Sequence, residues 1–300
     1  MRKSIVASAT ALAVVATGLA VVGVVGTARP SSAAVGDVPA DCMNWTTAYR
    51  SDGQRLAYKR SDRKTSTEAL PGDNLGFVPT AEWGGINSGG ADWWEGSSLF
   101  THPTDGYLYL LKRQGERIDG VWRVTTHRTT RLAPGFAGTR ILMGGGFPNP
   151  YYYRVAGNSL YRFKVTYSAG QPPAVSTPEK MPGSGWDSVK TLQYARTGGT
   201  AAAPVHVLLG TRTNGELKQW RISAATPATV TSTVLQSTGW GSFTSLTIGH
   251  CPSHPDGRSL MGITATGRAA VYFDANKKDG VGTDIKGGWL GLLGWTEKAY

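Results

Sequence analysis

The stretch Asn214-Gly-Glu-Leu-Lys-Gln-Trp-Arg221 contains the unit from which this chain is built. Its Asn-Gly pair predicts a tight turn, because glycine accepts positive φ, and the residues after the turn predict a short apolar strand. The same turn and strand recur at four other glycines: Gly53, Gly106, Gly157 and Gly267. The intervals of 53, 51, 58 and 52 residues indicate a structural repeat of about 52 residues.

A second landmark recurs with the same period and in the same order. It is an aromatic residue, usually preceded by glycine, that we expect to open a strand: Trp83, Phe136, Trp186, Trp240 and Trp289. Because these aromatics recur at one place in the repeat, they are either packing wedges between sheets or five equivalent sugar sites. Packing is the favoured interpretation, since sheets arranged in a ring must fill the space between them.

Each repeat predicts a four-stranded antiparallel sheet. A dense apolar strand at residues 204–210 precedes the turn, and a Thr- and Val-rich outer strand follows at 229–235. The prediction is therefore an all-β chain, a single five-bladed β-propeller over residues 35–300. The first copy begins with its second strand, at residues 45–49. We expect residues 288–295, which align with 239–246, to supply the missing strand and close the ring with the C-terminal strand.

The composition agrees with this fold class. The chain has 300 residues, of which 40 are glycine, and these glycines show no Gly-X-Y period. Its hydrophobic content of 40% and aromatic content of 10% are enough to form a core, which excludes a disordered or low-complexity chain.

Residues 1–34 have the pattern of a signal peptide. Arg2 and Lys3 precede an uncharged apolar run over residues 5–26, and small residues follow at Ser32-Ala-Ala34. A retained membrane anchor is the alternative, because the run is long enough to span a bilayer. The prediction is a secreted, extracellular protein with no stable membrane insertion after cleavage.

The two cysteines, Cys42 and Cys251, are expected to form one disulfide, since export exposes them to an oxidising compartment and two thiols allow one pairing. Such a bridge would join the last blade to the first. A zinc site at His250, Cys251 and His254 is the less favoured alternative, because the disulfide would remove the thiolate.

The formal charge of +11 falls to about +8 once Arg2, Lys3 and Arg29 are removed with the leader. A basic extracellular chain attracts anionic surfaces such as wall polymers and acidic glycans. No run of five or more Lys or Arg residues occurs, so a nucleic-acid partner is not expected.

Catalytic motifs are absent from the sequence. It has no Gly-x-Ser-x-Gly elbow, no zinc-binding His-Glu-x-x-His and no phosphate-binding loop, so we expect no cofactor and no metal. Glu82 and Asp92 are the least explained acidic pair, and a glycosidase would need such a pair. The favoured prediction is a protein that is not an enzyme.

Clusters of aromatic residues are a stronger indication of function than the acidic residues. Trp93 and Trp94 follow Asp92, and in an extended segment adjacent tryptophans point to opposite faces, so one of them is hard to bury. Tyr151, Tyr152 and Tyr153 pose the same problem. With Trp83, these are the candidate carbohydrate-binding residues, because sugar rings stack on exposed aromatic side chains; interblade packing is the alternative.

The Gly-Trp opening and the turn-Gly-x-Leu strand resemble two groups of extracellular propellers. Segments such as Asn158-Ser-Leu-Tyr161 and Asp105-Gly-Tyr-Leu-Tyr109 resemble the tachylectin family of five-bladed lectins. Residues 238–267 resemble secreted FG-GAP or VCBS-type repeats, although only Asp256-Gly257 remains of an acidic calcium loop.

The tachylectin resemblance implies a secreted, lectin-like protein that recognises surface glycans or polysaccharide without catalysis. The alternatives are a protein-binding module, with another secreted protein as its partner in a larger complex, and, third, a propeller glycosidase.

Overall fold

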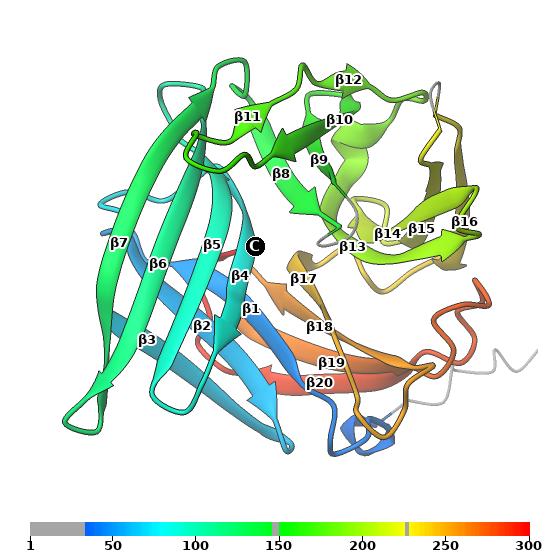
Figure 1. The fold of residues 1–300 in the computed structure, drawn as a ribbon. Helices are drawn as coiled ribbons and strands as arrows, with labels where there is room; N and C mark the ends of the chain where they lie inside the picture. The colour runs from blue at the N-terminus through cyan, green and yellow to red at the C-terminus, as the bar shows by residue number, and fades with distance from the viewer. Residues whose placement is uncertain (1–33, 146–149, 226–227) are drawn as a thin grey trace, which may run out of the picture. The chain divides into compact units, whose positions relative to one another are not determined.

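The computed structural model describes residues 34–145, 150–225 and 228–300, so that residues 1–33 of the predicted leader lie outside this part. The described residues contain no α-helix, only the single 3₁₀ turns η1 (Val35–Asp37) and η2 (Trp186–Ser188). Five antiparallel sheets follow one another around a ring (Figure 1). The predicted all-β, five-bladed β-propeller is therefore confirmed. No described helix has the length and apolar content that crossing a bilayer would require.

The blades are numbered in chain order, and each is given from its innermost strand outward. Blade 1 is β21 (Lys298–Ala299), β1 (Asn44–Tyr49), β2 (Gln54–Ser61) and β3 (Lys64–Asn74). Blade 2 is β4 (Ala81–Gly89), β5 (Trp93–Thr101), β6 (Leu108–Ile118) and β7 (Val121–Ala133).

The outer strand of blade 3 is split into two short pieces. This blade is β8 (Thr139–Gly144), β9 (Tyr151–Ala156) and β10 (Ser159–Thr166), with β11 (Ala174–Val175) and β12 (Glu179–Lys180) both pairing with β10. Blade 4 is β13 (Val189–Gly199), β14 (Pro204–Arg212), β15 (Leu217–Ser223) and β16 (Val230–Gln236). Blade 5 is β17 (Phe243–Gly249), β18 (Arg258–Thr264), β19 (Arg268–Asp274) and β20 (Lys286–Leu292).

The C-terminal strand closes the ring, but with other residues than predicted. Strand β21 pairs with β1, placing Ala299 opposite Ala48 and Lys298 opposite Tyr49. Most of the segment 288–295, expected in this role, lies instead in β20, where Trp289 pairs with Ala270 of β19. The physical reason is that blade 5 needs its own outer strand before the chain can pass to blade 1.

The five aromatic residues of the second sequence landmark do not all occupy the same structural position. Phe136, Trp186 and Trp240 are buried just before the innermost strands of blades 3, 4 and 5, which fits packing. Trp83 instead lies within β4, and Trp289 lies in β20 with 40% of its surface exposed. The aromatic residue that stands just before β21 is Trp295, which is 3% exposed and stacks on Tyr58 with 4.7 Å between ring centroids.

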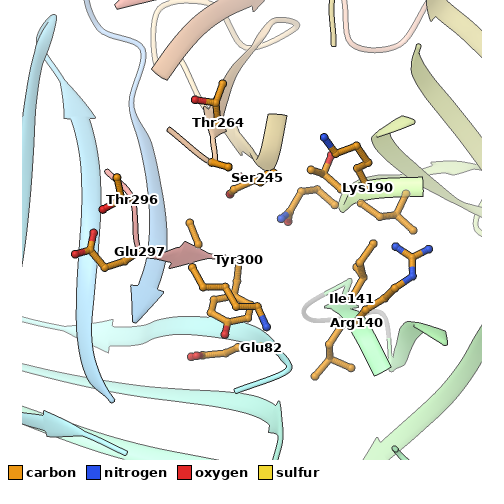
Figure 2. A pocket seen from close by; sticks show the side chains of 17 residues that line it. Glu82, Arg140, Ile141, Lys190, Ser245, Thr264, Thr296, Glu297 and Tyr300 are labelled. Atoms are coloured by element: carbon orange, nitrogen blue, oxygen red, sulfur yellow. The ribbon is translucent and has the colours of Figure 1, made fainter. Parts of the chain in front are cut away.

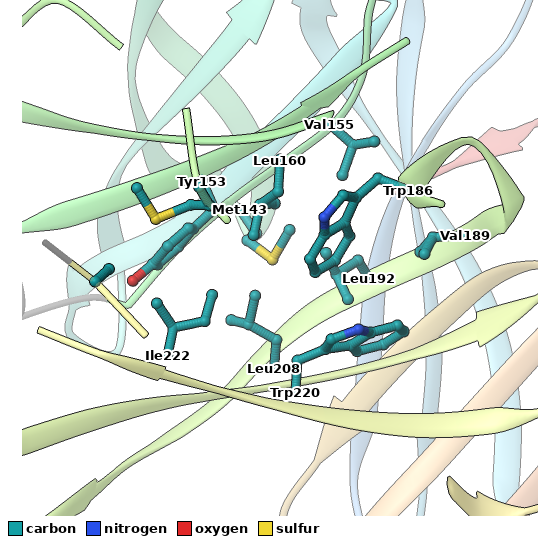
Figure 3. Close-up of a cluster of buried hydrophobic side chains, with 12 residues drawn as sticks. Met143, Tyr153, Val155, Leu160, Trp186, Val189, Leu192, Leu208, Trp220 and Ile222 are labelled. Atoms are coloured by element: carbon teal, nitrogen blue, oxygen red, sulfur yellow. The ribbon is translucent and has the colours of Figure 1, made fainter. Parts of the chain in front are cut away.

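Hydrophobic side chains fill the wedges between neighbouring blades. The largest cluster lies between blades 3 and 4, where Tyr153 and Leu160 meet Leu208, Trp220 and Ile222 (Figure 3). Strand alternation explains this placement, because every second residue of β9, β10, β14 and β15 faces the adjacent sheet.

The predicted disulfide is confirmed. Cys42 and Cys251 are bonded and buried, and they link the segment before β1 with the connection between β17 and β18. Beside them the backbones of Met43 and His250 exchange two hydrogen bonds of 2.8 and 3.1 Å. The bridge therefore joins blade 5 to blade 1, the last unit of the ring to the first.

Candidate functional site

A pocket of about 360 Å³ lies where the innermost strands of the propeller begin. All five innermost strands contribute to its lining, which places it on the axis of the ring (Figure 2). Its polar lining consists of hydroxyl groups, one amide and charged groups: Thr191, Thr244, Ser245, Thr264, Thr296, Gln193, Arg140, Lys190, Lys298, Glu82 and Glu297. The side chains of Leu142 and Leu192 and the ring of Tyr300 supply apolar parts of the lining.

Three of these residues occupy the same position in successive blades. Arg140, Lys190 and Thr244 are each the second residue of an innermost strand, and the pairing with the next strand skips a residue at each of these points. Such a bulge takes a side chain out of the regular alternation and re-aims it. In blades 3, 4 and 5 the bulge therefore turns a polar side chain toward the mouth of the pocket rather than into the interblade core.

The cationic side chains of blades 1, 3 and 4 each bind the following blade or the segment that leads into it. Arg140 donates to the carbonyl oxygens of Trp186 and Val189 at the start of blade 4. Lys190 donates to the carbonyl of Gly241, which precedes blade 5, at 2.5 Å. Lys298 donates to the carbonyls of Pro79 and Thr80, which precede blade 2, at 2.8 and 2.6 Å. These bonds fix the nitrogen atoms and leave other N–H groups on the same side chains.

Glu82 is buried in the wall of the pocket. Its carboxylate faces Arg55, whose Nε lies 3.8 Å away, and neither carboxylate oxygen has a hydrogen-bond partner among the described residues. Arg55 also approaches Asp73 at 3.5 Å, and Asp73 in turn binds Arg113 at 2.8 Å. His127 lies 3.6 Å from Asp73, and its pKa is lowered by burial. Glu82 thus belongs to a buried ionic cluster between blades 1 and 2.

Glu297 is engaged by a neighbour as well, because it accepts a hydrogen bond from the hydroxyl of Tyr58. Burial, together with that bond, raises the pKa of Tyr58 well above its usual value. Figure 2 shows Glu297, Glu82 and Tyr300 on one side of the pocket and Arg140 and Lys190 on the other. Arg140 and Lys190 therefore lie across the pocket from both carboxylates, while the third cation, Lys298, directly follows Glu297 in the chain.

A second cavity of about 180 Å³ adjoins the first and is aromatic in character. Trp45, Trp83 and Tyr194 line it, and it shares Glu82, Leu142, Gln193 and Tyr300 with the larger pocket. Trp83 is therefore the one candidate carbohydrate-binding residue from the sequence that the structure places at the ring axis. Its ring meets that of Tyr152 edge to face, 5.2 Å between centroids.

Of the two adjacent tryptophans of blade 2, one is exposed and the other is buried, as the alternation of side chains along a strand predicts. Trp93 is 48% exposed, whereas Trp94 is 7% exposed and lies 5.6 Å from the Arg113 guanidinium. Asp92 is exposed in the connection before β5. These three residues are at the far end of blade 2, away from the central pocket.

The tyrosine cluster of β9 packs mainly inside the molecule. Tyr153 is fully buried and its hydroxyl bonds to His206 Nδ1, while Tyr152 stacks on Phe163. Burial lowers the pKa of His206 to about 4. Tyr151 is half-buried beside His206. The structure therefore uses Tyr152 and Tyr153 for interblade packing, the alternative that the sequence left open.

Glu82 and Asp92, the acidic pair expected of a glycosidase, are not neighbours. The extended strand from Glu82 to Gly89 spans about 23 Å, and Asp92 lies beyond its end. Glycosidase carboxyl groups work within about 10 Å of each other. This pair therefore does not form a hydrolytic site.

Four residues of the pocket were not predicted from the sequence: Arg140, Lys190, Gln193 and Lys298. A signal for two of them was present, because Arg140 and Lys190 each stand four residues after an opening aromatic, Phe136 or Trp186. Lys298 had no comparable signal, since the strand that carries it was placed too early in the chain.

No protein-family model matches this chain, and no curated protein matches it.

Proposed function

We propose that this protein is a non-catalytic carbohydrate-binding propeller whose ligand lies at the ring axis. The observation that carries the proposal is the pairing of two adjacent cavities, one lined by hydroxyl, amide and amine groups and the other by Trp45, Trp83 and Tyr194. A sugar presents hydroxyl groups at its edge and C–H bonds on its face. It therefore needs both kinds of lining.

The proposal is for one central site rather than five repeated ones. The corresponding positions at the mouth carry different residues, Arg140, Lys190 and Thr244, so the blades do not offer equivalent chemistry. A volume of about 360 Å³ is at the lower end of the range for small-molecule sites, which suits one or two sugar rings. An extracellular location is part of the proposal and is supported by the leader-like residues 1–34 and by the disulfide.

The test is a glycan array with the purified full-length protein, followed by titration of the best ligand. Gln193→Leu removes an amide shared by both cavities and should weaken binding about tenfold, since one or two hydrogen bonds are lost. Trp93→Leu is the matched control at the far end of blade 2 and should leave the affinity unchanged.

Three outcomes would contradict the proposal. Absence of binding at dense presentation would remove the carbohydrate function. Loss of binding in Trp93→Leu but not in Gln193→Leu would move the site to blade 2. Cleavage of the bound oligosaccharide, as detected by mass spectrometry, would contradict a non-catalytic role.

A second candidate function, a protein-binding module, is favoured by the free end of blade 2. Ile118 and Val121 flank the hairpin turn between β6 and β7, and both are exposed, as is Trp93. A secreted partner that co-purifies with the protein should be lost in an Ile118→Ser, Val121→Ser double variant and should not be displaced by sugar. Retention of the partner by that variant would contradict this candidate.

A further inference from the structure

We infer that the sugar held in the central pocket is acidic, and that Arg140 and Lys190 bind its carboxylate. The inference rests on the proposed function and specifies its ligand class: a glycan containing a uronic acid. Three observations support it: cations that lack ion pairs, nitrogen atoms that are held in place, and the position of Arg140 and Lys190 across the pocket from both carboxylates.

The cations of the pocket are not neutralised. Within the part of the chain that the structure describes, Arg140, Lys190 and Lys298 form no ion pair with any carboxylate. Asp187 acts on Arg140 only from a longer distance. A pocket lined by unpaired cations favours an anion.

The acidic groups of the same pocket are turned to other partners. The oxygens of Glu82 are buried and face Arg55, while Glu297 accepts a hydrogen bond from the hydroxyl of Tyr58. Lys298 donates to the carbonyls of Pro79 and Thr80 in the segment that leads into β4. The carboxylates therefore do little to repel an anionic ligand at the opposite side.

The cationic groups are preorganised for binding. Carbonyl oxygens of the next blade hold Arg140 and Lys190, so little side-chain freedom remains to be lost when a ligand binds. An ammonium group has three N–H donors and a guanidinium five. Both side chains therefore keep donors for a carboxylate.

The position of Arg140 and Lys190 opposite the carboxylates sets the orientation of the ligand. Arg140 and Lys190 project from one side of the pocket and Glu82, Glu297 and Tyr300 from the other (Figure 2). The carboxylate of the sugar lies toward Arg140 and Lys190. Its hydroxyl groups then meet Gln193 and the threonine and serine side chains that line the same pocket. The net charge, about +8 without the leader, favours the approach of such an anionic glycan.

The test is isothermal titration of the full-length protein at low salt with three probes: a galacturonic acid trimer, the neutral galactose trimer and a sulfated galactose trimer. The galacturonic acid trimer should bind about tenfold more tightly than the neutral one, and the difference should shrink at high salt. Lys190→Gln keeps a donor for the Gly241 carbonyl but removes the charge. It should lose most of that tenfold preference, whereas Lys190→Arg should retain it.

Lys112→Gln is the matched control, because Lys112 is exposed on β6 and away from the pocket. It removes the same charge and should leave both affinities unchanged. Equal binding of acidic and neutral trimers would overturn the inference while leaving the proposed function intact. Tighter binding of the sulfated trimer would overturn the carboxylate assignment. Binding of none of the trimers or other glycans would remove the proposed function itself.

Discussion

The backbone N–H of Trp240 donates a hydrogen bond to the carbonyl of Gly215, 3.0 Å away. Gly215 lies in the turn between β14 and β15 of blade 4, and Trp240 stands just before blade 5. Phe136 and Gly106 make the same bond, at 2.8 Å, between blades 3 and 2. The two landmarks that recur in the sequence are thus the two sides of one joint between neighbouring blades. This contact explains why their order and period agree.

The turn glycines of this joint should differ in their sensitivity to substitution. Gly53 and Gly215 have φ of 84° and 92°, so alanine at either position should lower the free energy of unfolding by about 1 to 2 kcal/mol. A Cβ on Gly53 would also lie 2.4 Å from the backbone nitrogen of Phe77, whereas the nearest atom to a Cβ on Gly215 is 3.6 Å away. Gly53→Ala should therefore lower the free energy of unfolding by about 1 to 3 kcal/mol more than Gly215→Ala does.

Denaturant unfolding of the two variants measures this difference. Gly36→Ala is the control, because no atom lies within 4 Å of its added Cβ and it does not have positive φ. A Gly53→Ala variant as stable as Gly36→Ala would show that the turn is not held in this conformation.

Two tryptophans near the C-terminus should behave oppositely. Trp295 is buried, stacks on Tyr58 and donates from Nε1 to Thr67 at 2.9 Å, so Trp295→Ala should lower the free energy of unfolding by about 3 to 5 kcal/mol. Trp289 is partly exposed beside Arg268 and should cost only about 1 kcal/mol when replaced by alanine. Thermal unfolding of both variants compares them directly. A larger loss in Trp289→Ala would contradict the position of β21 as the closing strand.

The repeat was predictable because it depends on local signals. A turn glycine such as Gly215 needs positive φ, and a dense apolar strand such as residues 204–210 needs burial, and both leave marks within a few residues. The register of the last repeat was not predictable in this way. Residues 288–295 repeat the pattern of a first strand, and only the requirement that blade 5 keep four strands assigns most of them to β20.

The pocket was harder to predict than the ring. Its residues come from strands far apart in the sequence, and the bulges that turn Arg140 and Lys190 toward the mouth have no residue type of their own. The second difficulty was to predict which aromatic side chains are exposed. Trp93 and Trp94 are adjacent residues of the same type, yet Trp93 is exposed and Trp94 is buried. Pairing with the neighbouring blade decides such cases, and that information lies outside the local sequence.

The disulfide should contribute strongly to ring closure. Cys42 and Cys251 are 209 residues apart, and loop entropy gives an upper value of about 5 kcal/mol for such a bridge. A Cys42→Ala, Cys251→Ala double variant should unfold at lower guanidinium concentration than the oxidised protein. Addition of a reductant should destabilise the parent and leave the variant unchanged. A variant within about 1 kcal/mol of the oxidised parent would show that strand pairing alone closes the ring.

The stability of the protein should fall at acid pH because of His206. Burial lowers the pKa of His206 to about 4 in the folded state, while the ordinary value is 6.5. Between these pH values the unfolded chain binds a proton that the folded chain does not. The contribution of His206 to the free energy of unfolding is therefore complete above pH 6.5 and decreases as the pH falls toward 4.

His206→Gln tests this dependence, because glutamine can still bond to the Tyr153 hydroxyl but does not titrate. Its denaturant midpoint should change less than that of the parent between pH 6.5 and 4.5. His250→Gln is the control, since His250 is exposed, and should keep the slope of the parent. If the slope of His206→Gln matched that of the parent, another group would control the acid sensitivity. If only His206→Gln flattened the slope, the neutral imidazole between blades 3 and 4 would be the acid-sensitive contact of the propeller.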